Sequence, residues 1–207
     1  MRDRRITSVL AHPHDRTRRR LLAGLGAATL LSACGRAAPL SLHGIDLSHR
    51  SSFGRDFRLL DPQGRARTLA DFRGKIVLLF FGFTLCPDVC PTALTRAVQI
   101  RKLLGRDGER LQVIFITLDP ERDTPKVLQA YTQAFDPNFL GLTADAQTID
   151  ATAKAFRVVY AKVPTGSTYT IDHSALSYVY DADGALRMAL RHEQSAADCV
   201  HDIRQIL

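Results

Sequence analysis

The sequence from about residue 51 to the C-terminus has the hydrophobic pattern of a folded domain. Two segments, KIVLLFFGF at residues 75–83 and LQVIFITLD at residues 111–119, are apolar almost throughout. Such continuous apolar runs are typical of central strands that are buried on both faces. Between them, apolar residues recur at helical spacing and predict a helix that begins at Pro91 and ends at Gly105. These residues are Ala93, Ala97, Ile100 and Leu104.

Shorter patterns predict the rest of the domain. Residues 56–69 flank a Pro/Gly turn, which predicts an N-terminal hairpin. Helical patterns cover residues 124–135 and 145–156 and begin again at about Ser195, and residues 174–190 have the pattern of strand, tight turn and strand. Because strands alternate with helices, we predict an α/β fold with a mixed central sheet flanked by helices. A strand, then a cysteine pair and a helix, with a terminal hairpin and helix, indicate a thioredoxin-like layout.

A short apolar segment precedes this domain. Residues 21–33 carry no charge and follow the basic sequence TRRR at residues 17–20. This run is too short for a bilayer span, which needs about 20 apolar residues. A basic flank followed by a short apolar run is typical of an export signal, so we expect residues 1–33 to be a signal peptide. The alternative is a short buried helix.

The end of this segment, LSACG at residues 31–35, resembles the processing site of a bacterial lipoprotein. In such a site the cysteine becomes the lipidated first residue of the mature chain, so we expect lipidation of Cys34. The lipid would anchor the domain to a membrane of the bacterial cell envelope, outside the cytoplasm. The alternative is cleavage of an ordinary signal that leaves a free thiol at Cys34. The sequence TRRRLL also resembles a twin-arginine export signal.

Residues 34–50 have little periodicity and contain Pro39, Gly44 and two serines. This composition predicts a linker between the lipid anchor and a domain at residues 51–207.

The positive charge of the chain is concentrated in its first residues. Seven Arg and two Asp lie in residues 1–33, so this segment accounts for five of the seven net positive charges. The rest of the chain is close to neutral and has no cluster of Lys and Arg. Because binding to nucleic acid requires such a cluster, we expect no nucleic-acid partner.

Cys86 and Cys90 lie between the first buried strand and the helix that follows it. An exported chain meets an oxidising compartment, and α/β folds place their sites at the carboxyl ends of such strands. Cys90 immediately precedes Pro91, at the helix N-terminus, where the helix dipole favours the thiolate that acts as nucleophile or metal ligand. These positions favour a redox pair or a metal site over two structural core cysteines.

The spacing of the cysteines does not fully distinguish a redox pair from a metal site. Thioredoxin-type redox pairs have two residues between the cysteines, whereas Pro87, Asp88 and Val89 separate this pair. The wider loop would let both sulfurs face one ion and still form a disulfide. Two thiolates suit Cu(I), or zinc if four ligands are available, and the spacing does not decide between these ions.

Three segments together resemble the Sco/SenC family: GFTLCPDVCPTAL at residues 82–94, TLDPERDTP at residues 117–125 and YTIDHSALSYVYD at residues 169–181. The resemblance covers the chain from about Ser51 to the C-terminus. It implies a thioredoxin-fold copper protein that assists cytochrome oxidase assembly. It also implies the set of copper ligands, which would be Cys86, Cys90 and His173.

This resemblance favours a copper metallochaperone that binds Cu(I) and Cu(II) and acts on the copper-containing subunit of cytochrome oxidase. A thiol–disulfide oxidoreductase that reduces the cysteines of that subunit would need Cys86 and Cys90 but not His173. A copper- or redox-sensing interaction domain is a third alternative. Because a disulfide has no thiolate to offer, we also expect a thiol reductant of thioredoxin type as a partner. A conventional enzyme is not expected.

Several further residues are expected to serve the structure. Asp172 and His173 point to opposite faces if their segment is extended, which argues against Asp172 as the residue that orients the histidine. Asp88 has two equal interpretations, as a residue that tunes the site and as a solvated helix cap. Cys199 aligns with Ile203 at helical spacing and is expected in the core. The other histidines after the signal segment are expected to be solvated or at the surface: His43, His49, His192 and His201.

Overall fold

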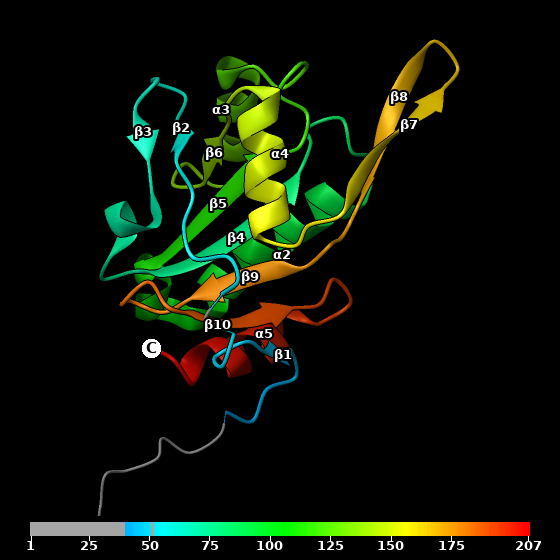
Figure 1. Cartoon of the computed structure of the whole chain (residues 1–207). Coiled ribbons are helices and arrows are strands. Elements are labelled where there is room, and N and C mark those ends of the chain that lie inside the picture. Colours follow the sequence, from blue (N-terminus) through cyan, green and yellow to red (C-terminus); the bar gives the residue numbers. More distant parts are fainter. Residues whose placement is uncertain (1–39, 51) are drawn as a thin grey trace, which may run out of the picture. The chain divides into compact units, whose positions relative to one another are not determined.

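A mixed six-stranded sheet forms the centre of the structure, a computed structural model that describes residues 40–50 and 52–207 (Figure 1). These residues belong to one compact unit, Leu40–Leu207. The strand order is β1–β10–β9–β4–β5–β6, in which β4, β5 and β6 are parallel and the other pairings are antiparallel. The strands are β1 (Ile45–Asp46), β4 (Ile76–Gly82), β5 (Leu111–Thr117), β6 (Leu140–Leu142), β9 (Ser177–Tyr180) and β10 (Leu186–Leu190).

β4 and β5 are the buried parallel strands that the two apolar runs predict. Every residue of both strands is buried, and their register pairs Ile76 with Leu111 and Gly82 with Thr117. The Leu118 N–H donates to the Gly82 carbonyl oxygen at 2.7 Å, just beyond the end of the ladder. The loops that follow the two strands therefore leave the sheet side by side, at the edge where α/β folds place their sites.

Helices cover both faces of the sheet. They are α2 (Val89–Leu104), α3 (Pro125–Gln133), α4 (Ala146–Ala155) and α5 (Ala196–Arg204), with 3-10 turns at η1 (Leu69–Phe72) and η2 (Gly105–Arg110). Each α-helix lies where its pattern predicts. α2 packs against α5, and Figure 1 shows α4 in front of the sheet and α2 behind it.

Two hairpins lie outside the central sheet. β2 (Leu59–Leu60) and β3 (Ala66–Arg67) form the predicted N-terminal hairpin. The sequence pattern does not predict the second hairpin, formed by β7 (Tyr160–Thr165) and β8 (Thr168–His173), which projects at the upper right of Figure 1. Its strands are largely exposed, so they lack apolar alternation, and β7 contains Pro164, a residue confined to edge strands.

The sequence predicts a linker at residues 34–50, but the second half of this segment is part of the folded unit. β1 lies at the edge of the central sheet and pairs with β10, with Ile45 opposite Ala189. The folded unit therefore begins at Leu40 rather than at residue 51. A strand with two paired residues gives no periodicity in the sequence, which is why the pattern indicates a linker here.

The predicted signal peptide, residues 1–33, and the predicted lipidation site, Cys34, lie outside the described residues. Among the residues that the structure describes, no helix has the length and hydropathy of a membrane span.

Candidate metal centre

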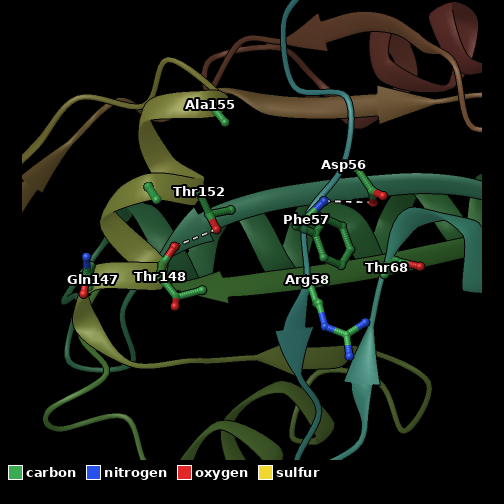
Figure 2. A pocket seen from close by; sticks show the side chains of 9 residues that line it. Asp56, Phe57, Arg58, Thr68, Gln147, Thr148, Thr152 and Ala155 are labelled. Atoms are coloured by element: carbon green, nitrogen blue, oxygen red, sulfur yellow. Dashed lines mark hydrogen bonds between the residues drawn. The ribbon is translucent and has the colours of Figure 1, made fainter.

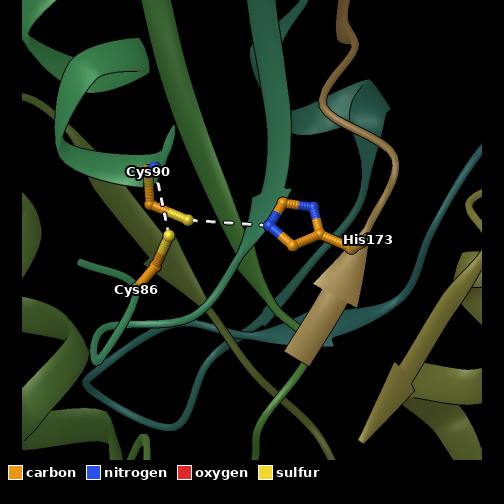
Figure 3. Close-up of side chains that lie close together, drawn as sticks. All are labelled: Cys86, Cys90 and His173. Carbon is orange, nitrogen blue, oxygen red and sulfur yellow. Dashed lines mark hydrogen bonds between the residues drawn. The ribbon is translucent and has the colours of Figure 1, made fainter. Parts of the chain in front are cut away.

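The two cysteines lie together at the carboxyl end of β4. Cys86 is half-buried in the loop after the strand, and Cys90 is fully buried in the first turn of α2. The Cys90 N–H donates to the Cys86 Sγ at 3.4 Å (Figure 3). The turn that closes the loop thus directs the Cys86 sulfur toward the start of the helix. Both cysteines are free thiols in the structure.

The position of the Cys90 sulfur depends on the last residue of β4. A Cβ on Gly82 would lie 2.6 Å from the Cys90 Sγ and 2.9 Å from the Phe115 ring. Real side chains essentially never approach so closely, so only glycine lets the buried sulfur pack against the strand. The glycine of the FFGF sequence is therefore required by space rather than by backbone conformation.

His173 reaches the cysteines from the end of β8. Its Nε2 lies 3.8 Å from the Cys90 Sγ, and its Nδ1 lies 3.0 Å from the Ser174 carbonyl oxygen. Because a carbonyl oxygen only accepts, Nδ1 carries the hydrogen in this contact and Nε2 presents its lone pair toward the sulfur. The edges of the Phe80 and Phe83 rings pack around the imidazole, with ring centroids 6.0 and 6.2 Å away.

Burial sets the protonation of these groups in the metal-free protein. Burial raises the pKa of the Cys90 thiol well above its usual range, despite a stabilising hydrogen bond from the backbone at Phe83. The electropositive helix end that the sequence places at Cys90 is therefore outweighed by loss of solvent. Burial also lowers the pKa of His173, against the opposing effects of the Ser174 carbonyl and Asp172. The site thus holds a neutral imidazole, the form that binds metals.

The segment DPERDTP supports the cysteine loop. Asp123 is buried, and its carboxylate accepts hydrogen bonds from the Thr84 hydroxyl at 2.5 Å, the Thr84 N–H at 3.1 Å and the Thr117 hydroxyl at 2.7 Å. These bonds join the end of β5 to the residue two positions before Cys86. A buried carboxylate needs such partners, so this acidic residue serves to fix the loop.

The same segment also holds the hairpin that carries His173. The Arg122 guanidinium lies 3.7 Å from the centroid of the Tyr169 ring and donates to the Tyr169 carbonyl oxygen at 2.9 Å. It also pairs with Asp119, whose carboxylate accepts from the Tyr169 hydroxyl at 2.8 Å. Lys162 lies 4.6 Å from the same ring. The β7–β8 hairpin does not pair with the central sheet, and these contacts fix it to the loop after β5.

The structure also places the other residues named from the sequence, and it agrees with only some of the expectations. Asp172 is exposed while His173 is half-buried, consistent with opposite faces of β8. Asp88 is exposed at the start of α2 and makes no side-chain cap hydrogen bond. Cys199 is fully buried on α5. His192 departs from expectation, because its Nδ1 is buried.

The sequence pattern does not single out Tyr131, which lies close to the site. This residue of α3 packs against the Phe115 ring, 5.6 Å between centroids, and its hydroxyl is buried without a hydrogen-bond partner among the described residues. Burial raises its pKa, with further contributions from Cys90 and Cys86. The aromatic pattern of α3 predicts a core position but gives no signal that the hydroxyl lies near the thiols.

The donor set fits a soft metal ion. Both sulfurs and one imidazole nitrogen lie within 4.8 Å of one another, and no further carboxylate, thiol or imidazole of the described residues joins this group. Structural zinc sites use four protein ligands, whereas soft thiolates with few partners suit Cu(I), and imidazole suits copper in either state. The cysteine spacing is compatible with copper and with zinc, and the geometry of the three donors favours copper.

A hollow elsewhere on the described surface lacks comparable chemistry. It measures about 650 Å³ and lies between α4 and the chain that leads into β2 (Figure 2). No Cys or His lines it. The Thr152 hydroxyl donates to the Thr148 carbonyl oxygen at 2.8 Å, and the Asp56 carboxylate accepts from the Leu69 N–H at 2.9 Å. It carries no functional assignment.

The parallel strands, the dithiol loop and the helix that begins beside Cys90 define a thioredoxin-like protein with a histidine beside its two thiols. Within this class the chain belongs to the SCO1/SenC family, whose model matches residues 45–207. The match begins at β1, in agreement with the folded unit seen here. The predicted family and fold class are thereby confirmed.

Individual relatives agree with this assignment. Over 188 residues the chain is 38% identical to the mitochondrial SCO2 homolog of Bos taurus, a match that covers 88% of this chain and 71% of the bovine protein. Over 168 residues it is 38% identical to an SCO2-like protein of Rickettsia felis, covering 79% and 82%. The structure of Bradyrhizobium japonicum ScoI with copper bound matches with a TM-score of 0.68 at 38% identity, over 75% of this chain and 99% of that chain.

Proposed function

We propose that the chain binds one copper ion through Cys86, Cys90 and His173 and delivers it to the copper-containing subunit of cytochrome oxidase. The observation that carries this proposal is the convergence of two thiols and one imidazole, from three separate positions in the sequence, within 4.8 Å. One relative of known structure, BsSco, is described as a member of the Sco family of cytochrome c oxidase assembly proteins. The B. japonicum relative was solved with copper bound.

Each ligand has a separate task in this proposal. The buried Cys90 sulfur fixes one coordination position, because Gly82 and the start of α2 hold it in place. Cys86 is half-buried and provides the sulfur that a partner can approach. His173 supplies a nitrogen donor, which supports Cu(II) more than Cu(I). A site with three protein ligands leaves room for a ligand of the acceptor protein to attack.

Binding to thiols must be coupled to proton release. Because burial keeps Cys90 protonated in the metal-free protein, loading with copper must displace its proton, and metal affinity should rise with pH. A disulfide between Cys86 and Cys90 would block loading altogether. A thiol reductant of thioredoxin type is therefore part of the proposal.

The lipid anchor at Cys34 and a location outside the cytoplasm are also proposed. Their support is the sequence LSACG after a short apolar run. Metabolic labelling with a fatty acid tests them: the wild-type chain should incorporate label and the Cys34→Ala variant should not. Equal labelling of the two proteins would refute lipidation at this residue.

Oxidase activity in cells separates the metallochaperone from its alternative. Strains carrying His173→Ala or Cys90→Ser at matched protein level are compared at limiting and at excess copper. A metallochaperone predicts that both variants fail at limiting copper. The control is His49→Ala, an exposed histidine outside the described metal-ligand clusters.

The second candidate, a thiol–disulfide oxidoreductase, is supported by the contact between the two cysteines, with the Cys90 N–H 3.4 Å from the Cys86 Sγ. It predicts normal oxidase activity for His173→Ala and failure for Cys90→Ser. A normal His173→Ala strain at limiting copper would therefore overturn the first proposal in favour of the second.

A further inference from the structure

A second group of metal-binding side chains lies between the N-terminal segment and α5. His43, His201 and Asp202 bring one potential ligand atom each within 4.8 Å of one another. The imidazole rings of His43 and His201 meet edge to face, 4.8 Å between centroids. The sequence predicts both histidines as solvated or surface groups, and the structure brings them together.

The spacing on α5 collects the carboxylates beside one of these rings. Asp198, His201 and Asp202 stand at positions i, i+3 and i+4, which share one helix face. The same i, i+3 spacing of a carboxylate and a histidine builds metal sites in helical bundles. Asp198 lies 3.8 Å from the His43 Nε2. The Ser195 hydroxyl donates to the Asp198 carboxylate at 2.7 Å and so holds it on this face of the helix.

Asp202 is buried and holds the groups around the cluster in place through hydrogen bonds. It is fully buried, and its carboxylate accepts from the His43 N–H at 2.9 Å, the Gly44 N–H at 2.8 Å and the Gln194 amide at 3.2 Å. The His201 Nδ1 lies 3.2 Å from the same carboxylate and donates to it. Because the carboxylate accepts from Nδ1, the Nε2 atom of His201 stays free to bind a metal ion. A carboxylate is a usual hydrogen-bond partner of a metal-binding histidine.

The backbone of His43 is also fixed, although its side chain is half exposed. The Arg191 guanidinium donates to the His43 carbonyl oxygen at 2.7 Å. A Cβ on Gly44 would lie 2.7 Å from the Ala189 carbonyl oxygen, so only glycine allows this approach to β10. The two rings are half exposed, with 52% and 51% of their side-chain surfaces open, so an ion from the solvent can reach them.

From this arrangement we propose a second metal site, in which His43, His201 and Asp198 bind a divalent transition-metal ion and Asp202 orients His201. Two imidazoles and a carboxylate are donors that suit Cu(II) and Zn(II), with Cu(II) the tighter, and they lack the thiolates that favour Cu(I). The ion would join the segment entering the folded unit to α5. This site is independent of the function proposed for Cys86, Cys90 and His173.

Zinc titration by calorimetry tests the proposal on the full chain in detergent, without a polyhistidine tag. In the background protein His12, His14, Cys34, Cys86, Cys90 and His173 are substituted, whereas His49, His192 and the buried Cys199 remain. We expect one Zn(II) per chain. His43→Gln and His201→Gln should each lower the affinity at least about tenfold, since even outer partners of a metal ligand have effects of this size.

A control variant and a Cu(II) spectrum show whether the bound ion is held by these histidines. His49→Gln removes an exposed histidine of the same segment and should leave the affinity unchanged. Cu(II) bound to the background protein should show electron paramagnetic resonance splitting from two nitrogens, and His43→Gln should reduce this to one. His43 has an exposed side chain, so circular dichroism should show an intact fold. No zinc binding by the background protein, or equal affinity after His43→Gln, would overturn the proposal.

Discussion

The two clusters of metal-binding side chains differ in burial and in donor atoms. Cys90 is fully buried and His173 is half-buried at the end of the parallel strands, and the ligands there are two sulfurs and one nitrogen. His43 and His201 are exposed, and their cluster offers nitrogen and oxygen only. The buried cluster suits a soft ion that must be protected from water and oxidation, whereas the exposed cluster suits a divalent ion that exchanges with solvent.

This difference also shows how each cluster is supported. The buried cluster depends on close packing at Gly82 and on a fixed hairpin, so its geometry should respond to core substitutions. The exposed cluster depends on the hydrogen bonds of one buried carboxylate, Asp202. Substitutions that disturb one cluster should therefore leave the other unchanged, and the following predictions test that independence.

The largest expected effect is loss of Cu(I) binding on removal of a thiol. Cys86→Ser or Cys90→Ser should lower Cu(I) affinity by at least about two orders of magnitude, because one thiolate and one imidazole are a poor set for this ion. Competition with a Cu(I) chelator measures it. Zinc affinity at the exposed cluster should not change. An unchanged Cu(I) stoichiometry in the double cysteine variant would contradict the ligand assignment.

The next effect concerns the support of the hairpin. Arg122→Ala should lower the free energy of unfolding by about 3 kcal/mol, because it leaves the buried Asp119 without its cationic partner. It should also weaken Cu(II) binding, since His173 lies on the released hairpin. Chemical denaturation and copper titration check both effects.

Lys162→Ala is the matched control, because Lys162 lies over the same Tyr169 ring but pairs with Glu121 in an exposed position. Its effect should be below about 1 kcal/mol. Equal effects of the two substitutions would show that the hairpin is not held through Arg122.

Overpacking at Gly82 should have a smaller effect on stability and a specific effect on copper. Gly82→Ala places a methyl group 2.6 Å from the Cys90 Sγ and should lower the free energy of unfolding by about 1–3 kcal/mol. Cu(I) affinity should fall with it. Gly141→Ala, where the nearest atom is the Leu128 Cβ at 3.0 Å, should lower stability alone. A copper affinity unchanged by Gly82→Ala would refute the role assigned to this glycine.

The smallest expected effect is a dependence of stability on pH. Burial lowers the pKa of His173 below its ordinary value of 6.5, so the unfolded chain binds more protons than the folded chain between these two pKa values. The free energy of unfolding should therefore fall as pH falls through this window. The metal-free, reduced His173→Ala variant should lack this part of the dependence. Urea unfolding at a series of pH values measures it, and parallel curves for the two proteins would contradict it.

The sequence predicts the parts of the fold that are buried and continuous. β4 and β5 have uninterrupted apolar residues, and α2 has a regular apolar stripe, so pattern alone locates the strand, the cysteine loop and the helix. The spacing of Cys86 and Cys90 predicts a shared site but leaves the ion open. Only the resemblance to a family supplies His173 as the third ligand.

The remaining features depend on contacts that a pattern does not encode. The β7–β8 hairpin is held by side chains such as Arg122 and Tyr169, far apart in sequence, so its exposed strands carry no apolar alternation. β1 is fixed by one strand pairing and by Asp202. His43 and His201 are separated by most of the domain, and only the folded chain brings them together. The buried hydroxyl of Tyr131 belongs to the same class of tertiary effects.

X-ray absorption spectroscopy of the reduced full chain, loaded with one equivalent of copper, shows directly whether Cys86, Cys90 and His173 bind the ion together. We expect two sulfur scatterers and one nitrogen scatterer around the copper. The nitrogen contribution should disappear in His173→Ala and persist in His201→Gln. A spectrum without nitrogen, or one that is the same in wild type and His173→Ala, would refute this set of ligands.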